Sequence, residues 1–221
     1  MSLEPVAEGV YIQRHPLRMM GCRLGRVVTV IRLGSGKLLI HSTAPFSNED
    51  RSDILSVGEP ACLMEASNFH DTATDEGRRA FGEVPYFVPS GFRRLSEPGT
   101  ANIDELPDDG EVVIVKIGGV PKLNEYAVFH APTKTLIVAD LFFNLPDSVG
   151  TWTKWFLKTT VGLDSYPGQS RLLSHYIKDH SAYIDSVNQI AELDFDRIIV
   201  GHGDPVTHDA KAVFREILLT S

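Results

Sequence analysis

Four short apolar runs, each followed by a histidine, asparagine or aspartate, constrain the fold of this chain more than any other feature. The runs and the polar residues after them are Leu38–Ile40 with His41, Ala61–Ala66 with Asn68 and His70, Thr135–Ala139 with Asp140, and Ile198–Val200 with His202. Short apolar runs bounded by turn residues are typical of buried strands. If these strands lie side by side and point the same way, their polar side chains meet at one edge of a sheet.

The remaining sequence alternates between strand-like and helical patterns. Strands are predicted at Gly9–Gln13, Arg26–Leu33, Lys37–Ile40, Tyr86–Val88 and Glu111–Ile117, with a hairpin at Glu125–His130 and Thr135–Ala139. Helices are predicted at about 48–57, 72–81, 151–161 and 207–219, one or two more helices at about 169–192, and a loop at 94–110. Gly34–Gly36 suits a tight hairpin turn, and Ser47–Asp50 is a capping box for the first helix. This order predicts one layered α/β or α+β domain with mixed sheets, spanning residues 1–221.

The composition argues against several classes of partner. The 221 residues carry a net charge of −8, and an acidic surface repels phosphate backbones, so no nucleic-acid partner is expected. No apolar run is long enough to cross a bilayer, and the N-terminus lacks the pattern of a signal peptide, so no membrane partner is expected. The two cysteines, Cys22 and Cys62, cannot form a disulfide framework, which favours a reducing, cytoplasmic location.

The residues that follow the strands are suited to metal chemistry. Imidazole nitrogens and carboxylate oxygens are the usual ligands of zinc, and of iron or manganese in mixed sites. A bound divalent ion would lower the pKa of a water molecule and polarise a bond to be broken. Each residue also has a structural explanation: His70 can cap the next helix, Asp140 can accept hydrogen bonds from loop amides, and His202 can pair with Asp140. Glu125 is interpreted as an edge charge.

At these residues the chain resembles the metallo-β-lactamase fold superfamily, and within it a short branch with a degenerate metal-binding motif. Four segments are similar to family motifs: Lys37–Ala44 to the early strand ending in Asp-Thr-Gly, with His41 at the Asp position; Ala66–Ala73 to the Thr-His-x-His-x-Asp-His loop; Leu136–Phe142 to the Gly-Asp-Leu strand; and Gly201–Gly203 to the late His-Gly loop. The resemblance implies an α+β fold, a four-layer αβ/βα sandwich with two mixed sheets flanked by helices.

The chain departs from the family pattern at several ligand positions. Asn68 stands in place of the first histidine of the metal loop, while Thr72 and Ala73 replace its aspartate and last histidine. The position of the family's middle ligand falls at about Gly119, which has no side chain. The resemblance therefore leaves three ligands, which are also the candidate catalytic residues: His70, Asp140 and His202. Further donors from His41, Asp71 or Asp204 remain open, whereas His130 lies across a hairpin from the ligand position.

The resemblance implies a hydrolase-like protein with an incomplete metal site, acting on an ester, lactone, thioester or similar bond of a small molecule. It would hold one zinc, iron or manganese ion, or none, with His41, Asn68 and Asp204 as substrate-binding residues. The alternative is a non-catalytic domain that binds a small molecule or a protein on a degenerate hydrolase scaffold, and an iron-binding oxidoreductase ranks last. The aromatic stretch Trp152–Phe156 is expected in the core; if exposed, it would form a lid or the face of a homodimer.

Overall fold

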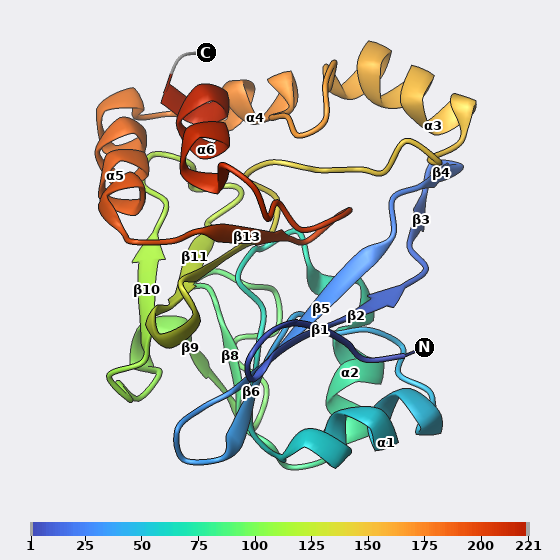
Figure 1. The fold of residues 1–221 in the computed structure, drawn as a ribbon, viewed down its shortest axis with the longest axis vertical. Coiled ribbons are helices and arrows are strands. Elements are labelled where there is room, and N and C mark those ends of the chain that lie inside the picture. The colour runs from blue at the N-terminus through green and yellow to red at the C-terminus, as the bar shows by residue number, and fades with distance from the viewer. Residues whose placement is uncertain (1, 220–221) are drawn as a thin grey trace.

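Two β-sheets lie face to face at the centre of the computed structural model, which describes residues 2–219 (Figure 1). The larger sheet has seven strands in the order β1-β2-β5-β6-β7-β8-β9. These strands are β1 (Glu4–Ala7), β2 (Val10–His15), β5 (Arg26–Arg32), β6 (Lys37–His41), β7 (Glu59–Met64), β8 (Tyr86–Val88) and β9 (Thr100–Asn102). The sheet is mixed: β1, β2, β5 and β6 pair antiparallel, and β6 to β9 pair parallel.

The smaller sheet has four strands in the order β10-β11-β12-β13. They are β10 (Val112–Lys116), β11 (Tyr126–His130), β12 (Thr135–Val138) and β13 (Arg197–Val200). Strands β12 and β13 run parallel, with Val138 opposite Val200. Because the two strands end level with each other, Asp140 and His202 emerge at the same edge of the sheet.

Helices cover the outer faces of both sheets, so the molecule has four layers. Helices α1 (Asn48–Val57) and α2 (Thr74–Phe81) cover the seven-stranded sheet, and α5 (His180–Glu192) and α6 (Ala210–Leu219) cover the four-stranded sheet (Figure 1). The alternation of side chains along β12 explains the layering: Leu136 and Val138 pack towards α5 and α6, while Ile137 packs between the sheets. The predicted four-layer αβ/βα sandwich is confirmed.

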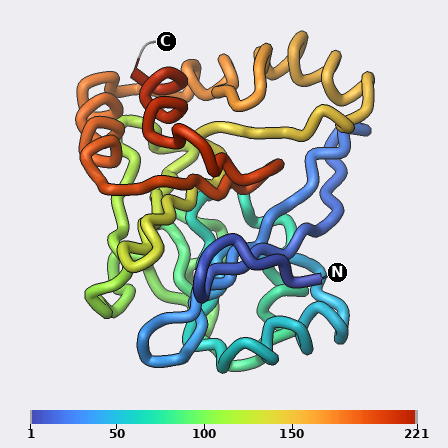
Figure 2. Tube along the Cα trace, in the orientation of Figure 1, coloured from blue at the N-terminus to red at the C-terminus, as the bar shows by residue number. Residues whose placement is uncertain are grey.

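The chain between β12 and α5 runs over the edge of the sandwich, beside the hairpin of β3 (Arg18–Met19) and β4 (Cys22–Arg23) (Figure 2). It contains α3 (Thr151–Phe156), a π-helical turn η4 (Leu157–Val161) and α4 (Arg171–Tyr176). The expectation that Trp152–Phe156 lies in the core is wrong for both tryptophans, which are more than half exposed. Their rings stack on each other, 5.1 Å apart, on a helix at the periphery of the fold.

Several predicted boundaries need correction. The segment at 94–110 is not all loop, because it contains β9 and the 3-10 turn η2 (Ile103–Glu105); β9 is stabilised by pairing with β8, a contact between distant segments. The helix expected at 72–81 begins as a 3-10 turn, η1 (Asp71–Ala73), whereas the region at 169–192, predicted as one or two helices, contains α4 and α5 as expected. A further 3-10 turn, η3 (Ala131–Thr133), joins β11 to β12.

The predicted capping box is present, with the Ser47 side chain accepting from the Asp50 amide and the Asp50 side chain accepting from the Ser47 amide. Within the described residues, no helix is both long enough and apolar enough to cross a membrane.

Candidate metal centre

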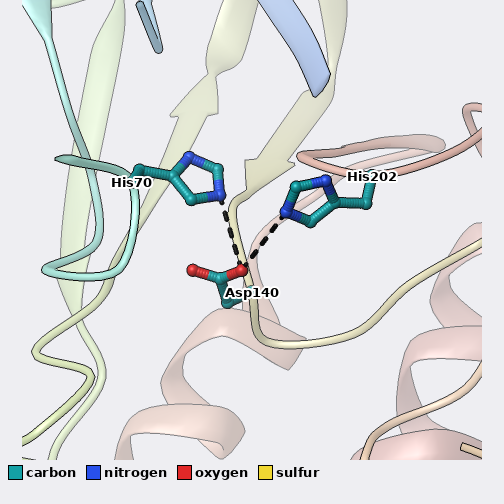
Figure 3. A group of neighbouring side chains, drawn as sticks. All are labelled: His70, Asp140 and His202. Atoms are coloured by element: carbon teal, nitrogen blue, oxygen red, sulfur yellow. Dashed lines mark ion pairs between the residues drawn. The ribbon is translucent and has the colours of Figure 1, made fainter. Parts of the chain in front are cut away.

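Three side chains from distant parts of the sequence meet at one edge of the two sheets. The Oδ1 atom of Asp140 lies 3.4 Å from Nε2 of His70 and 3.5 Å from Nε2 of His202 (Figure 3). One ligand atom from each residue lies within 4.8 Å of the other two, and no other group of three such residues is found in residues 2–219. The predicted convergence of the strand ends is therefore present at these three positions.

Two neighbours hold Asp140 in place. The Glu125 carboxylate accepts hydrogen bonds from the amides of residues 139, 140 and 141, at 2.8, 2.9 and 3.3 Å, and so fixes the turn after β12. The Ser67 hydroxyl donates to Oδ2 of Asp140 at 2.7 Å, which leaves Oδ1 directed at the two histidines. Glu125 is fully buried, so its interpretation as an edge charge is wrong. Burial, together with the nearby Asp140 charge, raises the pKa of Glu125 to about 8.

The ring of His202 has a fixed orientation. Its Nδ1 lies 2.6 Å from the carbonyl oxygen of Gly25, an acceptor, so Nδ1 carries a proton and Nε2 faces Asp140. The ring also stacks on Phe143, with centroids 5.4 Å apart. This arrangement directs the Nε2 atom of His202 towards the centre of the cluster.

His70 lies between two carboxylates and is buried. Its Nδ1 is 3.6 Å from Oε2 of Glu65, whose other oxygen accepts from the amide and hydroxyl of Thr43. Burial lowers the pKa of His70, but the Asp140 charge and the contacts with Asp140 and Glu65 together raise that pKa to about 9. Burial disfavours the charged form of Asp140, but the charge on His70 and the contacts with both histidines together hold the pKa of Asp140 well below its usual range. The pair therefore favours a cation at Asp140, whether a proton on His70 or a metal ion.

The other candidate residues lie around this cluster. Asn68 lines the same cavity, and its buried Oδ1 has no hydrogen-bond partner among the described residues. Asp71 also lines the cavity, but its carboxylate is 3.5 Å from Arg93. Asp204 is outside the cavity lining and pairs with Arg14 at 2.9 Å. Gly119 packs directly on the backbone of α5, so no ligand side chain fits at that position.

His41 is behind the cluster rather than in the cavity. It ends β6, is 1% exposed, and neither ring nitrogen forms a hydrogen bond with the described residues. Burial lowers the pKa of His41 to about 4, so the ring is neutral at physiological pH. The structure thus places His41 where a substrate in the cavity does not reach it.

The buried neutral ring of His41 predicts a loss of stability in mild acid. The unfolded chain binds a proton at the ordinary histidine pKa of about 6.5, whereas the folded chain binds it only near pH 4. The stabilisation is present above pH 6.5 and decreases as the pH falls to 4, by about 3 kcal/mol for this ring. We expect urea unfolding of His41→Leu to show a pH dependence smaller by this amount between pH 7.5 and 4. An unchanged pH dependence would contradict the assignment.

The cluster opens into a cavity of about 610 Å³. His70, Asp140, His202 and Asn68 lie at its polar end, and the hairpin β3–β4, the η4 turn and α4 form its walls. A cavity of this size accommodates a small-molecule ligand.

Sequence reasoning missed the residues that support the cluster, which are Ser67, Glu65 and Glu125 as anchors and Gly25 as the acceptor for His202. Glu65 is inside the apolar run 61–66, and Glu125 opens a strand. An acidic residue within or beside a buried strand needs a hydrogen-bond or charge partner. This requirement is the one signal in the sequence that could have identified Glu65 and Glu125 as supporting residues.

The three donors suit a divalent metal ion. Ligands of a tetrahedral zinc site, each about 2.0–2.2 Å from the ion, lie about 3.3–3.6 Å apart, and the donor distances of 3.4 and 3.5 Å fall in this range. The buried Nε2 of His70 makes no hydrogen bond within residues 2–219, as expected for a ligand atom. Two imidazoles and one carboxylate match the ligand set of catalytic sites with three protein ligands.

Comparisons with proteins of known structure find the same fold in several enzymes. TMB-1 aligns over 99% of this chain and 97% of its own, with a TM-score of 0.63 and 15% identity. The DIM-1 metallo-β-lactamase, in a structure exposed to ceftazidime, covers 99% of this chain and 96% of its own, with a TM-score of 0.65 and 14% identity. A metallo-β-lactamase from Erythrobacter litoralis covers 99% of this chain and 92% of its own, with a TM-score of 0.64 and 13% identity. No family model and no curated protein matches the sequence. The likeness is one of fold.

Proposed function

We propose, from the premise that this chain has the metallo-β-lactamase fold, that it is a hydrolase with a single-metal site formed by His70, Asp140 and His202. The observation that supports this proposal is the convergence of three potential ligand atoms on the polar end of a cavity. Zinc is the ion that this ligand set favours, with iron or manganese as alternatives. When bound, such an ion acts as a Lewis acid towards the bond to be hydrolysed.

The residues of the cluster would supply the charge and the ligand atoms for the ion, and Asn68 would bind the substrate. Asp140 supplies the negative charge, and the two imidazoles direct Nε2 atoms at it. Asn68 lines the cavity beside the cluster, and the NH2 group of its side-chain amide can donate a hydrogen bond to the carbonyl oxygen of a substrate. We propose an ester, lactone or thioester as the substrate and Asn68 as its binding residue.

A reaction without metal is less consistent with the charges in the cluster. Burial opposes protonation of His70, but the Asp140 charge and the contacts with Asp140 and Glu65 together raise its pKa to about 9, so His70 holds a proton at neutral pH and cannot accept one from water. Metal binding removes that proton. The metal affinity should therefore increase with pH up to about 9 and then level off.

The proposal is tested by metal content and turnover. We expect the purified protein to bind about one equivalent of zinc, iron or manganese by mass spectrometry, and to hydrolyse members of an ester, lactone and thioester panel. His202→Ala removes one of three ligands and should weaken metal binding about 10²-fold or more, since loss of even an outer partner of a ligand costs 10- to 100-fold.

His208→Ala is the matched control, because His208 is an exposed histidine six residues further along the same segment. It should leave both metal binding and turnover unchanged. If neither metal nor turnover is found in the wild-type protein, the hydrolase proposal fails and the binding-domain alternative is preferred.

A further inference from the structure

Away from the cluster, the walls of the cavity are mostly apolar. Its lining includes Leu24 after the β3–β4 hairpin, Phe143 after β12, Leu157 and Val161 in η4, Leu163, and Leu173 in α4. Leu24, Leu157 and Leu163 belong to one buried apolar cluster, so these walls are parts of a packed layer. The cavity therefore has a polar end and an apolar body.

The charged side chains in the lining offer little to a charged substrate. Arg26 is buried, and one nitrogen of its guanidinium donates to the carbonyl oxygen of Thr43 at 2.8 Å, while its Nε has no hydrogen-bond partner among the described residues. Asp71 lies 3.5 Å from Arg93. Arg18 is on the exposed hairpin strand β3, at the surface end of the cavity. Away from Arg26 and the polar end, a strongly charged group in the body of the cavity would lose its hydration against apolar walls.

The rim of the cavity is also apolar. Met19, Phe69 and Leu172 line it and remain 56%, 40% and 42% exposed. They come from three separate segments, which are β3, the loop after β7 and α4. Apolar side chains grouped around an opening that leads to a reactive cluster are typical of a ligand entrance.

We infer that the substrate is an uncharged carboxylic ester or thioester with a medium-length aliphatic acyl chain, which occupies the apolar body while its carbonyl group lies at the His70–Asp140–His202 end. This inference rests on the proposed hydrolase function. In the reaction, the oxygen of water forms a bond to the acyl carbon, and the bond from that carbon to the leaving oxygen or sulfur breaks. One proton of the water passes to the leaving group, giving a carboxylic acid and an alcohol or thiol.

The first test compares 4-nitrophenyl acetate, butyrate and octanoate, which share one leaving group. Burying a methylene strengthens binding about fourfold, so kcat/KM for the octanoate should exceed that for the acetate by at least about 10²-fold. Leu172→Glu places a charge on the apolar rim and should lower kcat/KM for the octanoate about tenfold, with less than about a twofold change for the acetate. Leu55→Glu is the control, because Leu55 is 36% exposed on α1, away from the cavity, and should change neither value.

The second test measures binding without turnover, by ligand-detected NMR with octanamide and acetamide. We expect octanamide to bind at millimolar concentration or below, acetamide not to bind, and Leu172→Glu to weaken octanamide binding about tenfold. Octanamide binding without hydrolysis of any ester would overturn the hydrolase function and support the apolar site. Hydrolysis that is equally fast for all three chain lengths, or absence of octanamide binding, would overturn the inferred substrate class and leave the hydrolase function standing.

Discussion

Replacing Asp140 with asparagine is expected to reduce turnover about 10³-fold or more. Asp140 is the single anionic ligand candidate of the cluster, and its Oδ1 lies 3.4 and 3.5 Å from the two imidazole nitrogens. Asparagine keeps the shape and the neutral oxygen but removes the charge that favours a cation there. A metal ion supplies several kcal/mol of transition-state stabilisation, and about 4 kcal/mol corresponds to 10³-fold in rate. Turnover of an ester panel and metal content by mass spectrometry measure the effect.

Asp185→Asn controls for the loss of one negative charge, since Asp185 is exposed on α5. It should retain the metal and the activity of the wild-type protein. Circular dichroism establishes that Asp140→Asn is folded, so that loss of metal is not mistaken for unfolding. A folded Asp140→Asn protein with wild-type turnover would show that Asp140 is not a ligand in the reaction.

The position of the site could be predicted because strand ends are visible in the sequence. The parallel pairing of β12 and β13 is the physical reason that Asp140 and His202 meet, and the apolar runs before them are clear strand patterns. His70 reaches the same place from the other sheet, along the loop after β7. Sequence alone could not give the pairing order of the strands, which depends on contacts between distant segments.

The predicted roles were less accurate where burial decides them. His41 follows an apolar run just as His202 does, yet it is the last residue of β6 and lies between neighbouring strands, so its ring is in the interior. The apolar cavity walls were also invisible, because Leu24, Leu157 and Leu173 come from three separate segments with ordinary core patterns. A pattern of residue types does not state which apolar side chain faces a cavity.

Three positions where related sites carry metal ligands, 72, 73 and 119, have no metal-ligating side chain in this protein, and this supports a single metal ion. At Gly119 an added Cβ would lie 2.0 Å from the carbonyl oxygen of Asp179, so the backbone of α5 occupies the space of a ligand side chain. Thr72 and Ala73 bring no imidazole or carboxylate to the metal loop, and the group around Asp140 contains three donors. Three ligands with an open position suit one catalytic ion, and the described residues provide no second set.

Replacing Gly203 with alanine is expected to destabilise the fold by about 3 kcal/mol or more and to displace His202. Gly203 has a φ of +113°, a conformation that side chains with a Cβ rarely adopt, which alone costs about 1–3 kcal/mol. An added Cβ would also lie 2.0 Å from the carbonyl oxygen of Asn144 and 2.3 Å from its carbonyl carbon, so one of the two chain segments must move. Both segments adjoin the candidate metal centre, because the Asn144 amide donates to the carbonyl oxygen of His202 at 3.2 Å.

Urea unfolding and zinc titration of Gly203→Ala separate these two effects, with Gly150→Ala as the matched control. Gly150 has a φ of −59° and no atom within 4 Å of an added Cβ, so alanine should change the free energy of unfolding by less than about 1 kcal/mol there. At temperatures where Gly203→Ala remains folded, its zinc affinity should fall at least about tenfold, since the Nε2 of His202 no longer faces Asp140 at the distance that metal binding needs. A Gly203→Ala protein with the stability and zinc affinity of the wild type would mean that the turn does not fix His202, and the ligand geometry would have to originate elsewhere.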